Sequence, residues 1–387
     1  MDFGNTAGNI IKDQKKLSFD YVPKELPNRD EQIKNLFGLF KGVVKSDVSQ
    51  NVFLHGQVGT GKTATAKRFC MDFKDWAKDK DKNIEYVFVN CRRRKNNSSA
   101  MWKIVHHFDK GFPDRGFSVG EMMEILKNKL KEQKTHLIVV MDEVDALIQK
   151  DGSELIYLLT RFNEEELTSV GNVSLILISQ KNAFNLLEES ALSSFKRSNR
   201  VRFPKYSSDE LYEILSQRID LALFPGAIED EELRLLSDIA GKKGDARFGI
   251  ELLEKSSLIA EMDGRDQVRS EDVRGAKAEV DPYVTESRLK NLNEQEKVIL
   301  LAVTRKLKKQ AYTTTGVVEE LYKIICEEYD FKKLGHTQFW KYLKSLSNDG
   351  LIETKTVSDG SGRTTKVSIA DIPAERMEKK LLEILGR

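Results

Sequence analysis

The sequence has 387 residues and a mass of 44.2 kDa, more than one hydrophobic core normally organises, so two or three domains are expected. Hydrophobic residues make up 40% and charged residues 32%, a globular balance, and no apolar run approaches the ~18–20 residues that cross a membrane. Residues Met1–Asn5 do not begin a secretory signal, so a cytoplasmic protein is expected. A net charge of +2 excludes a strongly basic protein, and any nucleic-acid contact must come from local patches.

The three cysteines, Cys70, Cys91 and Cys326, are far apart in the sequence. None belongs to a C-x-x-C pair, and none has a histidine partner nearby. The spacing therefore predicts neither a disulfide framework nor a zinc site, and we expect core or surface thiols.

The first 20 residues are polar and weakly patterned. We expect residues 1–18 to form a flexible arm, with order beginning near Phe19. Two prolines, Pro23 and Pro27, then precede a helical pattern that has acidic residues near its start, where the helix dipole favours them.

The segment Gly56–Thr63 fits the phosphate-loop pattern G-x-x-x-x-G-K-[ST]. A strand-like run, residues 51–54, leads into it, and a helical run, residues 64–69, leaves it, which is the context that the motif requires. Glycines let the loop turn its N–H groups toward phosphates, while Lys62 reaches the β and γ phosphates and the Thr63 hydroxyl holds Mg²⁺. The expected nucleotide-binding residues here are Gly56, Gln57, Val58, Gly59, Thr60, Gly61, Lys62, Thr63 and Ala64. An ordinary glycine-rich turn is the weaker alternative.

A second strand is expected at 85–90, followed by the basic run Arg92–Lys95 and a helix. The segment Phe112–Ser118 breaks the pattern, and another helix follows it. Four adjacent cations could hold phosphates, although such runs are more often solvated turns.

An acidic cluster follows Leu137–Met141, five apolar residues that suit a strand buried on both faces. At the carboxyl end of such a strand, Asp142 is expected to bind Mg²⁺ through water and Glu143 to activate the attacking water as a general base. The alternative is that one of these carboxylates only caps the next helix.

Further strands are expected at 173–179 and 201–204, which gives a parallel α/β sheet of five strands with helices between them. From Ser207 to about Asp281 the apolar pattern is wholly helical. We expect a nucleotide-binding domain at 19–205, a helical lid at 206–283 and a third domain at 284–387.

In the third domain, Asn293 and Glu296 resemble a capping box that opens the first of three helices, and two alternating segments, 351–357 and 364–369, follow them. Three helices and a β-hairpin predict a winged helix. The third helix turns an apolar face inward and a polar, basic face outward. The candidate DNA contacts on this helix and the wing are Thr337, Lys341, Lys344, Arg363, Thr364 and Lys366. Winged helices also serve as protein-interaction domains, so this alternative stays open.

Together these motifs resemble the initiator branch of the AAA+ ATPases, and more closely the archaeal origin-recognition/cell-division-control replication initiators. The opening Tyr21-Val22-Pro23-x-x-Leu26-Pro27-x-Arg29-Asp30, the strand end Val89-Asn90-Cys91-Arg92 and Gly244-Asp245-Ala246-Arg247 carry the resemblance, which covers residue 19 to the C-terminus. It implies that Val22, Pro23 and Arg29 pack on the adenine. It also implies that Arg247 is the second sensor near the γ-phosphate, and that Arg115 touches DNA from a helical-hairpin insertion.

The sequence departs from this family in two places. The usual Asn-Asp after the fourth strand is replaced by Gln180 and Lys181, and Gln180 could still orient the attacking water. Where an Asp-Pro-Arg supplies an arginine to a neighbour's site, this chain has Glu188–Ser190, and the spacing of Arg197 and Arg200 does not match. Because an arginine finger contributes about 10³–10⁵ in rate, its absence favours slow hydrolysis.

Three functions remain in competition. The resemblance favours a nucleoid-associated initiator that binds duplex origin DNA, uses ATP/ADP and Mg²⁺ as a switch, retains ADP and helps recruit the replicative helicase, with other initiator paralogues as further partners. A helicase- or clamp-loading ATPase acting on protein is the alternative. A signalling NTPase that controls transcription fits least, because no ligand-sensing repeats follow the winged helix.

Overall fold

The computed structural model describes residues 9–162, 171–180, 199–281, 286–359, 362–369 and 372–386. The chain forms two compact units, Val22–Tyr206 and Met1–Tyr21 with Ser207–Arg387. Within the described residues, no helix has the length and apolarity that a membrane span needs.

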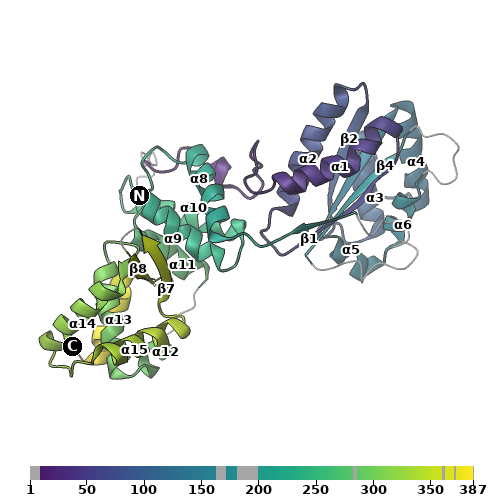
Figure 1. The fold of residues 1–387 in the computed structure, drawn as a ribbon. Helices are drawn as coiled ribbons and strands as arrows, with labels where there is room; N and C mark the ends of the chain where they lie inside the picture. The colour runs from purple at the N-terminus through teal and green to yellow at the C-terminus, as the bar shows by residue number, and fades with distance from the viewer. Residues whose placement is uncertain are drawn as a thin grey trace, which may run out of the picture. The chain divides into compact units, whose positions relative to one another are not determined.

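The unit Val22–Tyr206 is built on a parallel sheet of five strands in the order β2-β3-β4-β1-β5 (Figure 1). The strands are β1 Asn51–Gly56, β2 Asn83–Asn90, β3 Thr135–Asp142, β4 Val173–Ser179 and β5 Arg200–Phe203. The parallel sheet and its strand segments are confirmed. Because β1 lies between β4 and β5, its carboxyl end opens beside strands that are distant in the sequence, where ligands bind in such sheets.

Helices cover both faces of this sheet (Figure 1). On one face, α1 Asp30–Ser46 and α2 Lys62–Lys78 bury residues such as Phe40 and Phe69 against the strands. On the other lie α3 Asn97–Phe108, α4 Val119–Glu132, α5 Val144–Asp151 and α6 Glu154–Thr160. The central strand β4 is buried along its whole length, which explains why its sequence is an uninterrupted apolar run.

His136 on β3 is a buried titratable group in this sheet. The residue is 7% exposed, and Nε2 lies 2.7 Å from the Ser174 hydroxyl. Burial lowers the pKa of His136 to about 4, with Asp47 and Lys82 acting in opposite directions. Between pH 6.5 and 4, His136 is therefore protonated in the unfolded state and neutral in the folded state.

We accordingly expect acidification through that window to destabilise this unit. Stability is fully present above pH 6.5 and is lost as the pH falls toward 4, by up to about 3 kcal/mol from this residue. Denaturant unfolding at several pH values measures the slope of the unfolding free energy against pH. The slope should be shallower in His136→Gln than in the wild type, and equal slopes would exclude His136 as its cause.

In the second unit, the chain after Ser207 first forms four helices: α8 Ser208–Ala222, α9 Asp230–Gly241, α10 Ala246–Met262 and α11 Ser270–Val280. Ser207 and Glu210 form a capping box that starts α8. The helical lid expected from the apolar periodicity is present.

The N-terminal segment packs against this lid, which corrects the expectation of a flexible arm for residues 9–18. Ile10 and Leu17 are fully buried, and a short 3₁₀ helix spans Gln14–Leu17. The backbone N–H groups of Ile10 and Ile11 donate to Glu261. Residues 1–8 lie outside the described residues. Apart from Ile10, Ile11 and Leu17 this segment is polar, and these three residues form no repeating pattern, so the packing has no clear signal in the sequence.

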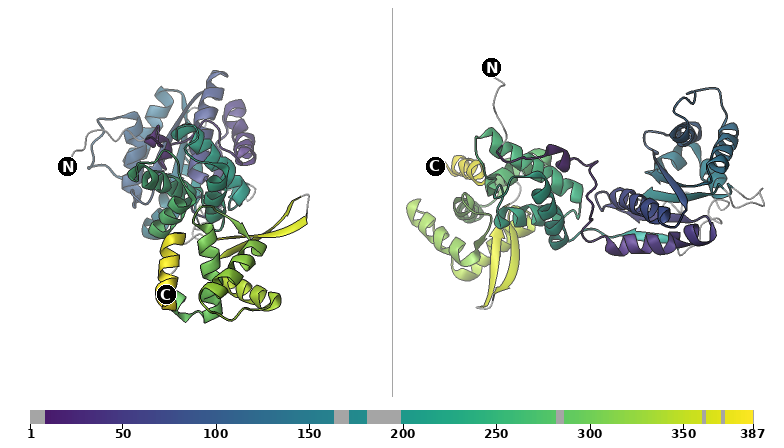
Figure 2. Two further views of the ribbon diagram at one scale, coloured as in Figure 1. Left: turned by 90° about the vertical axis from the view of Figure 1, so that its left-hand side faces the viewer. Right: turned by 90° about the horizontal axis from the view of Figure 1, so that it is seen from above.

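The rest of the second unit is a winged helix, with helices α12 Glu286–Asn291, α13 Glu294–Leu307, α14 Thr315–Glu328, α15 His336–Asn348 and α16 Ala374–Leu385. Its antiparallel sheet has the order β6-β8-β7, from β6 Thr313–Thr314, β7 Glu353–Asp359 and β8 Gly362–Ser368. Figure 2 shows the β7–β8 hairpin extending away from the helices of this domain, as a wing does.

Candidate functional site

The phosphate loop connects β1 to α2 and depends on glycine for its shape. Gly59 and Gly61 have φ values of 71° and 86°, a region in which glycine carries no steric cost. A side chain on Gly61 would also meet the Tyr206 hydroxyl at 2.6 Å. Gly61 directly precedes the first turn of α2, so the loop leads the chain into a helix N-terminus that favours anions.

Arg29 supports this loop from inside the protein. Its side chain is 2% exposed, with Nε donating to the Thr60 carbonyl at 3.0 Å and Nη2 to the Pro204 carbonyl at 3.2 Å. The guanidinium also lies 3.7 Å from the centre of the Tyr206 ring. Arg29 thus joins the loop to the segment after β5. Its expected contact with adenine, like those of buried Pro23 and half-buried Val22, stays a prediction.

Three of the predicted active groups meet at the end of β1. The Lys62 ammonium donates to the carbonyls of Gly56 and Gln57 at 2.8 and 2.5 Å, which holds the charge over the loop. The Thr63 hydroxyl donates to Asp142 at 2.8 Å. Hydroxyl and carboxylate oxygens are the ligands that Mg²⁺ prefers, and the ion normally keeps several waters, so this pair fits a magnesium site.

Glu143 follows Asp142 in a left-handed conformation, with φ 54°. This turn lets the Glu143 N–H donate to Asp142 at 2.9 Å. The Glu143 carboxylate contacts two groups at the end of β2: the amide of Asn90, the last residue of the strand, at 3.5 Å, and Arg92 at 3.4 Å. The carboxylate predicted to be the general base therefore lies next to the Thr63–Asp142 pair, and its orientation depends on the end of β2.

Asn90 and Arg92 were not predicted as site residues. The signal that could have identified them is the register, because parallel pairing places Asn90 opposite Asp142. Register between strands separated by two helices cannot be read from periodicity alone. Gln180, predicted to orient water, is exposed after β4, and the preceding Ser179 hydroxyl donates to Asp145 at 2.9 Å.

The electrostatic surroundings of the loop are positive. Burial, with the charges of Arg200, Arg202 and Lys62, lowers the pKa of His55 at the end of β1 and favours its neutral form. Cys91 beside the acidic cluster is buried, and burial together with the nearby carboxylates raises its pKa to about 12, so its thiol stays protonated. Cys70 and Cys326 are also buried free thiols. Over the described part of the chain, no cluster of three metal-binding side chains occurs.

Arg247, the predicted second sensor, lies in the first turn of α10. Asp245 caps this helix by accepting from the Arg247 and Phe248 N–H groups at 2.8 and 3.2 Å. The Arg247 side chain is exposed and belongs to the lid. Its role toward the γ-phosphate stays a prediction.

The segment predicted to touch DNA connects α3 and α4. Arg115 lines a surface pocket of about 560 Å³ together with Arg94, Trp102 and Phe117. Arg94 lies 4.8 Å from the Trp102 ring centre, and the Trp102 indole donates to the Pro113 carbonyl at 3.0 Å. Arg94, one of the four cations in the basic run, therefore lines the same pocket as Arg115, the predicted DNA contact.

The third helix of the winged helix, α15, divides as its sequence predicts. Phe339, Leu343 and Leu346 are buried. The outward face carries the exposed residues Thr337, Lys341, Lys344 and Asn348. Trp340 adjoins this face at 36% exposure and was not among the predicted contacts.

On the wing, Arg363 and Lys366 are exposed, and Thr364 is half-buried. The Lys366 ammonium lies 5.4 Å from the centre of the Tyr312 ring. Gly360, between the two strands of the wing, lies outside the described residues. So do Lys181, Glu188–Ser190 and Arg197, whereas Arg200 is exposed on β5.

Family models match all three parts of the chain: an AAA domain over residues 47–187, the Cdc6 AAA+ ATPase-type lid domain over 212–278 and the CDC6 C-terminal winged helix domain over 287–379. An ORC1-type DNA replication protein 2 of Saccharolobus solfataricus is 32% identical, with 97% of this chain and 94% of the relative covered. An ORC1-type DNA replication protein of Pyrococcus abyssi is also 32% identical, covering 95% of this chain and 89% of the relative.

Solved structures agree. The chain is similar to Cdc6p of Pyrobaculum aerophilum, with a TM-score of 0.84, 28% identity and coverage of 97% of this chain and 99% of that one. It is also similar to ORC1 of Aeropyrum pernix in complex with DNA, with a TM-score of 0.64, 28% identity and 97% coverage of both chains. The fold and the phosphate loop define an AAA+ ATPase with a winged helix. The chain belongs to the archaeal ORC1/Cdc6 family of DNA replication initiators.

Proposed function

We propose that the chain binds duplex DNA at replication origins, and that ATP binding and slow hydrolysis switch this binding. The observation that carries the proposal is the set of exposed cations on α15 and the wing, Lys341, Lys344, Arg363 and Lys366, on the unit that also contains Arg247. Phosphate contacts supply much of the affinity for DNA, so one such face suffices even at a net charge of +2.

In the nucleotide site, Lys62 would bind the β and γ phosphates, and Thr63 with Asp142 would hold Mg²⁺. The bound ion offsets the negative charge of the phosphates. Glu143 would accept the proton of the attacking water, and Gln180 would orient that water. Val22 and Pro23 would contact the adenine, with Arg29 behind them. A solved relative, ORC2 of Aeropyrum pernix, forms ADPNP and ADP complexes, which supports the choice of an adenine nucleotide.

Two features support a slow, regulatory ATPase over a fast motor. The residues expected to supply an arginine finger are Glu188–Ser190, which contain no arginine. Glu143 also contacts Asn90 and Arg92, and these contacts compete with the water that Glu143 would activate. We expect purified protein to retain ADP.

For DNA, Thr337 and the basic residues of α15 would enter the major groove, and Arg363, Thr364 and Lys366 of the wing would follow the backbone or minor groove. Arg115 would add a contact from the α3–α4 segment. The ORC1 protein of Aeropyrum pernix was solved in complex with DNA, which supports this assignment. Recruitment of the replicative helicase and association with initiator paralogues rest on the family resemblance.

Removing one wing cation tests the DNA face. Arg363→Ala is expected to weaken duplex binding by about 10–100-fold, because a hydrogen bond to a charged group contributes roughly 1.5–3 kcal/mol. The slope of log K against log[salt] should fall by about 1, since one phosphate contact is lost. Fluorescence anisotropy with labelled duplex, measured at several salt concentrations, gives both quantities.

Lys379→Ala is a matched control, because Lys379 is an exposed cation on α16 of the same domain. This control should retain the wild-type affinity and salt slope. If Arg363→Ala is indistinguishable from the wild type, the wing does not bind DNA. If the wild type itself ignores duplex DNA while protein partners stimulate its hydrolysis, the remodelling-ATPase alternative replaces the initiator function.

A further inference from the structure

Arg274 on α11 is fully buried, an unusual position for a guanidinium. A buried charge is costly unless its hydrogen bonds are all made. We therefore expect the groups around Arg274 to accept hydrogen bonds from its guanidinium.

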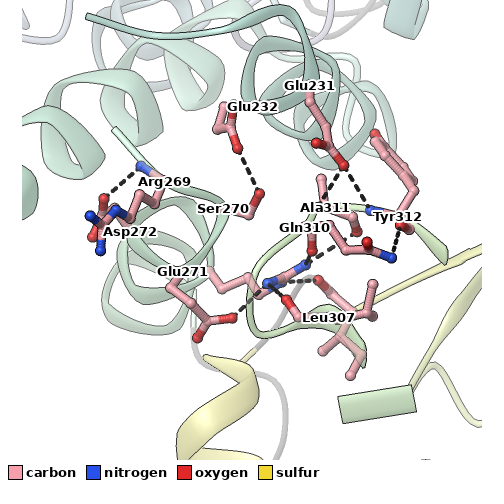
Figure 3. A network of polar contacts seen from close by, with 12 residues as sticks. Glu231, Glu232, Arg269, Ser270, Glu271, Asp272, Leu307, Gln310, Ala311 and Tyr312 are labelled. Carbon is pink, nitrogen blue, oxygen red and sulfur yellow. Dashed lines mark hydrogen bonds and ion pairs between the residues drawn. The ribbon is translucent and has the colours of Figure 1, made fainter. Parts of the chain in front are cut away.

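All five N–H groups of Arg274 have an acceptor. Nε donates to the Ile369 carbonyl at 2.9 Å, and Nη1 donates to the Leu307 carbonyl at 2.8 Å and to Glu271 at 2.6 Å. Nη2 donates to the carbonyls of Gln310 and Ala311 at 2.9 and 3.2 Å. Glu271 belongs to the lid, while the four carbonyls belong to the winged helix. One lid side chain thus binds backbone groups from three places in the DNA-binding domain: the end of α13, the segment before β6 and the residue after β8. Figure 3 labels Leu307, Gln310 and Ala311 from the first two places, and Glu271 of the lid.

The segment before β6 is also held from its N–H side. Glu231 of α9 accepts from the Ala311 and Tyr312 N–H groups at 2.8 and 3.3 Å (Figure 3). The Tyr312 hydroxyl donates to Asp238 of the lid at 2.8 Å. Because two lid helices bind opposite sides of the same short backbone segment, that segment cannot shift without breaking several hydrogen bonds, most of which are at least partly buried.

Surface ion pairs extend this contact to the wing. Lys355 of β7 lies 3.2 Å from Asp238, and Lys242 at the end of α9 pairs with Glu353 of β7. Such exposed pairs contribute little alone. They do show that the base of the wing faces the lid.

We propose that Arg274 is a positioning residue that clamps the winged helix to the lid, so that lid, α15 and wing move as one rigid body. The proposal rests on the proposed function in one respect: that function assigns nucleotide sensing to Arg247 of the lid and DNA binding to α15 and the wing. The clamp places both on one rigid body. A lid displacement set by the nucleotide state is then passed to the DNA-binding face without a hinge in between.

The chemistry requires arginine at this position. A lysine ammonium has three donors on a flexible stem and would leave at least two of the five acceptors unpaired. Arg274→Lys therefore keeps the charge while removing the clamp, which separates geometry from electrostatics.

Distance measurement by pulsed electron spin resonance tests the clamp without DNA. Met262 of the lid and Ile324 of α14 are 86% and 57% exposed, so cysteines at these positions accept spin labels, whereas the three native cysteines are buried. In the otherwise unchanged protein we expect one narrow distance distribution that is the same with ADP and with a non-hydrolysable ATP analogue. A nucleotide-dependent shift in this distance would overturn the rigid body.

In Arg274→Lys the distribution should broaden, with or without nucleotide. Arg265→Lys is the control, because Arg265 makes ion pairs with Asp263 and Asp272 inside the lid and none with the winged helix in the described residues. A wild-type distribution in folded Arg274→Lys would overturn the role of Arg274. Should that variant not fold, Glu231→Ala, at an exposed position, takes its place with the same two outcomes.

Duplex affinity supplies a second readout. In the wild type the affinities with ATP and with ADP should differ, and in Arg274→Lys their ratio should fall toward one while Arg265→Lys keeps it. If the wild type does not bind DNA, the proposed function is contradicted. The clamp is then tested by the spin-label distances alone, because that measurement does not use DNA. An unchanged affinity ratio in Arg274→Lys counts against the clamp alone.

Discussion

Replacement of Glu143 by glutamine is expected to lower the rate of ATP hydrolysis by about 10²–10⁴-fold, the usual contribution of a general base. The amide keeps the size of the side chain and can still accept from Asn90, but it cannot take a proton from water. ATP binding should change little, because the phosphate loop and the Thr63–Asp142 pair are untouched. Single-turnover hydrolysis and equilibrium ATP binding separate the two effects.

Glu154→Gln is the control for this change, since Glu154 is an exposed carboxylate at the start of α6 in the same unit. It should hydrolyse ATP at the wild-type rate. Wild-type hydrolysis by Glu143→Gln would remove Glu143 from the mechanism and direct attention to another base.

Replacement of Lys62 by alanine is expected to weaken ATP binding by about 10–100-fold, since each hydrogen bond from a charged donor contributes roughly 1.5–3 kcal/mol. Lys62 is also the buried cation that ties together the carbonyls of Gly56 and Gln57. Its loss therefore removes both a phosphate ligand and a support of the loop. Calorimetric titration with ATP and with ADP measures the change.

Lys67→Ala is the matched control, because Lys67 lies on the same helix α2 and is only half-buried. Its nucleotide affinity should match that of the wild type. If Lys62→Ala binds ATP as tightly as the control does, the loop is not the phosphate site.

Local patterns predicted the framework of the nucleotide site well, for physical reasons. The apolar run before Asp142 is long enough to require burial on both faces, and the glycines of Gly56–Thr63 have a conformational role that few other residues can fill. Both signals lie within a few neighbouring residues. The outward face of α15 was predictable in the same way, because helical periodicity alone separates Lys341 and Lys344 from Leu343.

Features that depend on tertiary neighbours could not be predicted. Nothing in the sequence around Arg274 distinguishes it from a solvated arginine, since its five acceptors come from segments both near and far along the chain. The same holds for Arg29, whose partners Thr60 and Pro204 are distant in sequence. Burial of Ile10 and Leu17 likewise depends on the lid helices.

Nucleotide control of duplex binding is the central claim, and one comparison tests it most directly. Anisotropy titrations on a single origin duplex and its scrambled counterpart would use Glu143→Gln loaded with ATP, wild-type protein loaded with ADP, and nucleotide-free Lys62→Ala. We predict salt-sensitive binding that prefers the origin sequence and differs by about 5-fold or more between the ATP-loaded protein and the other two, as a coupling of at least ~1 kcal/mol requires. Equal affinities in all three proteins, or negligible binding that salt does not change, would contradict the claim.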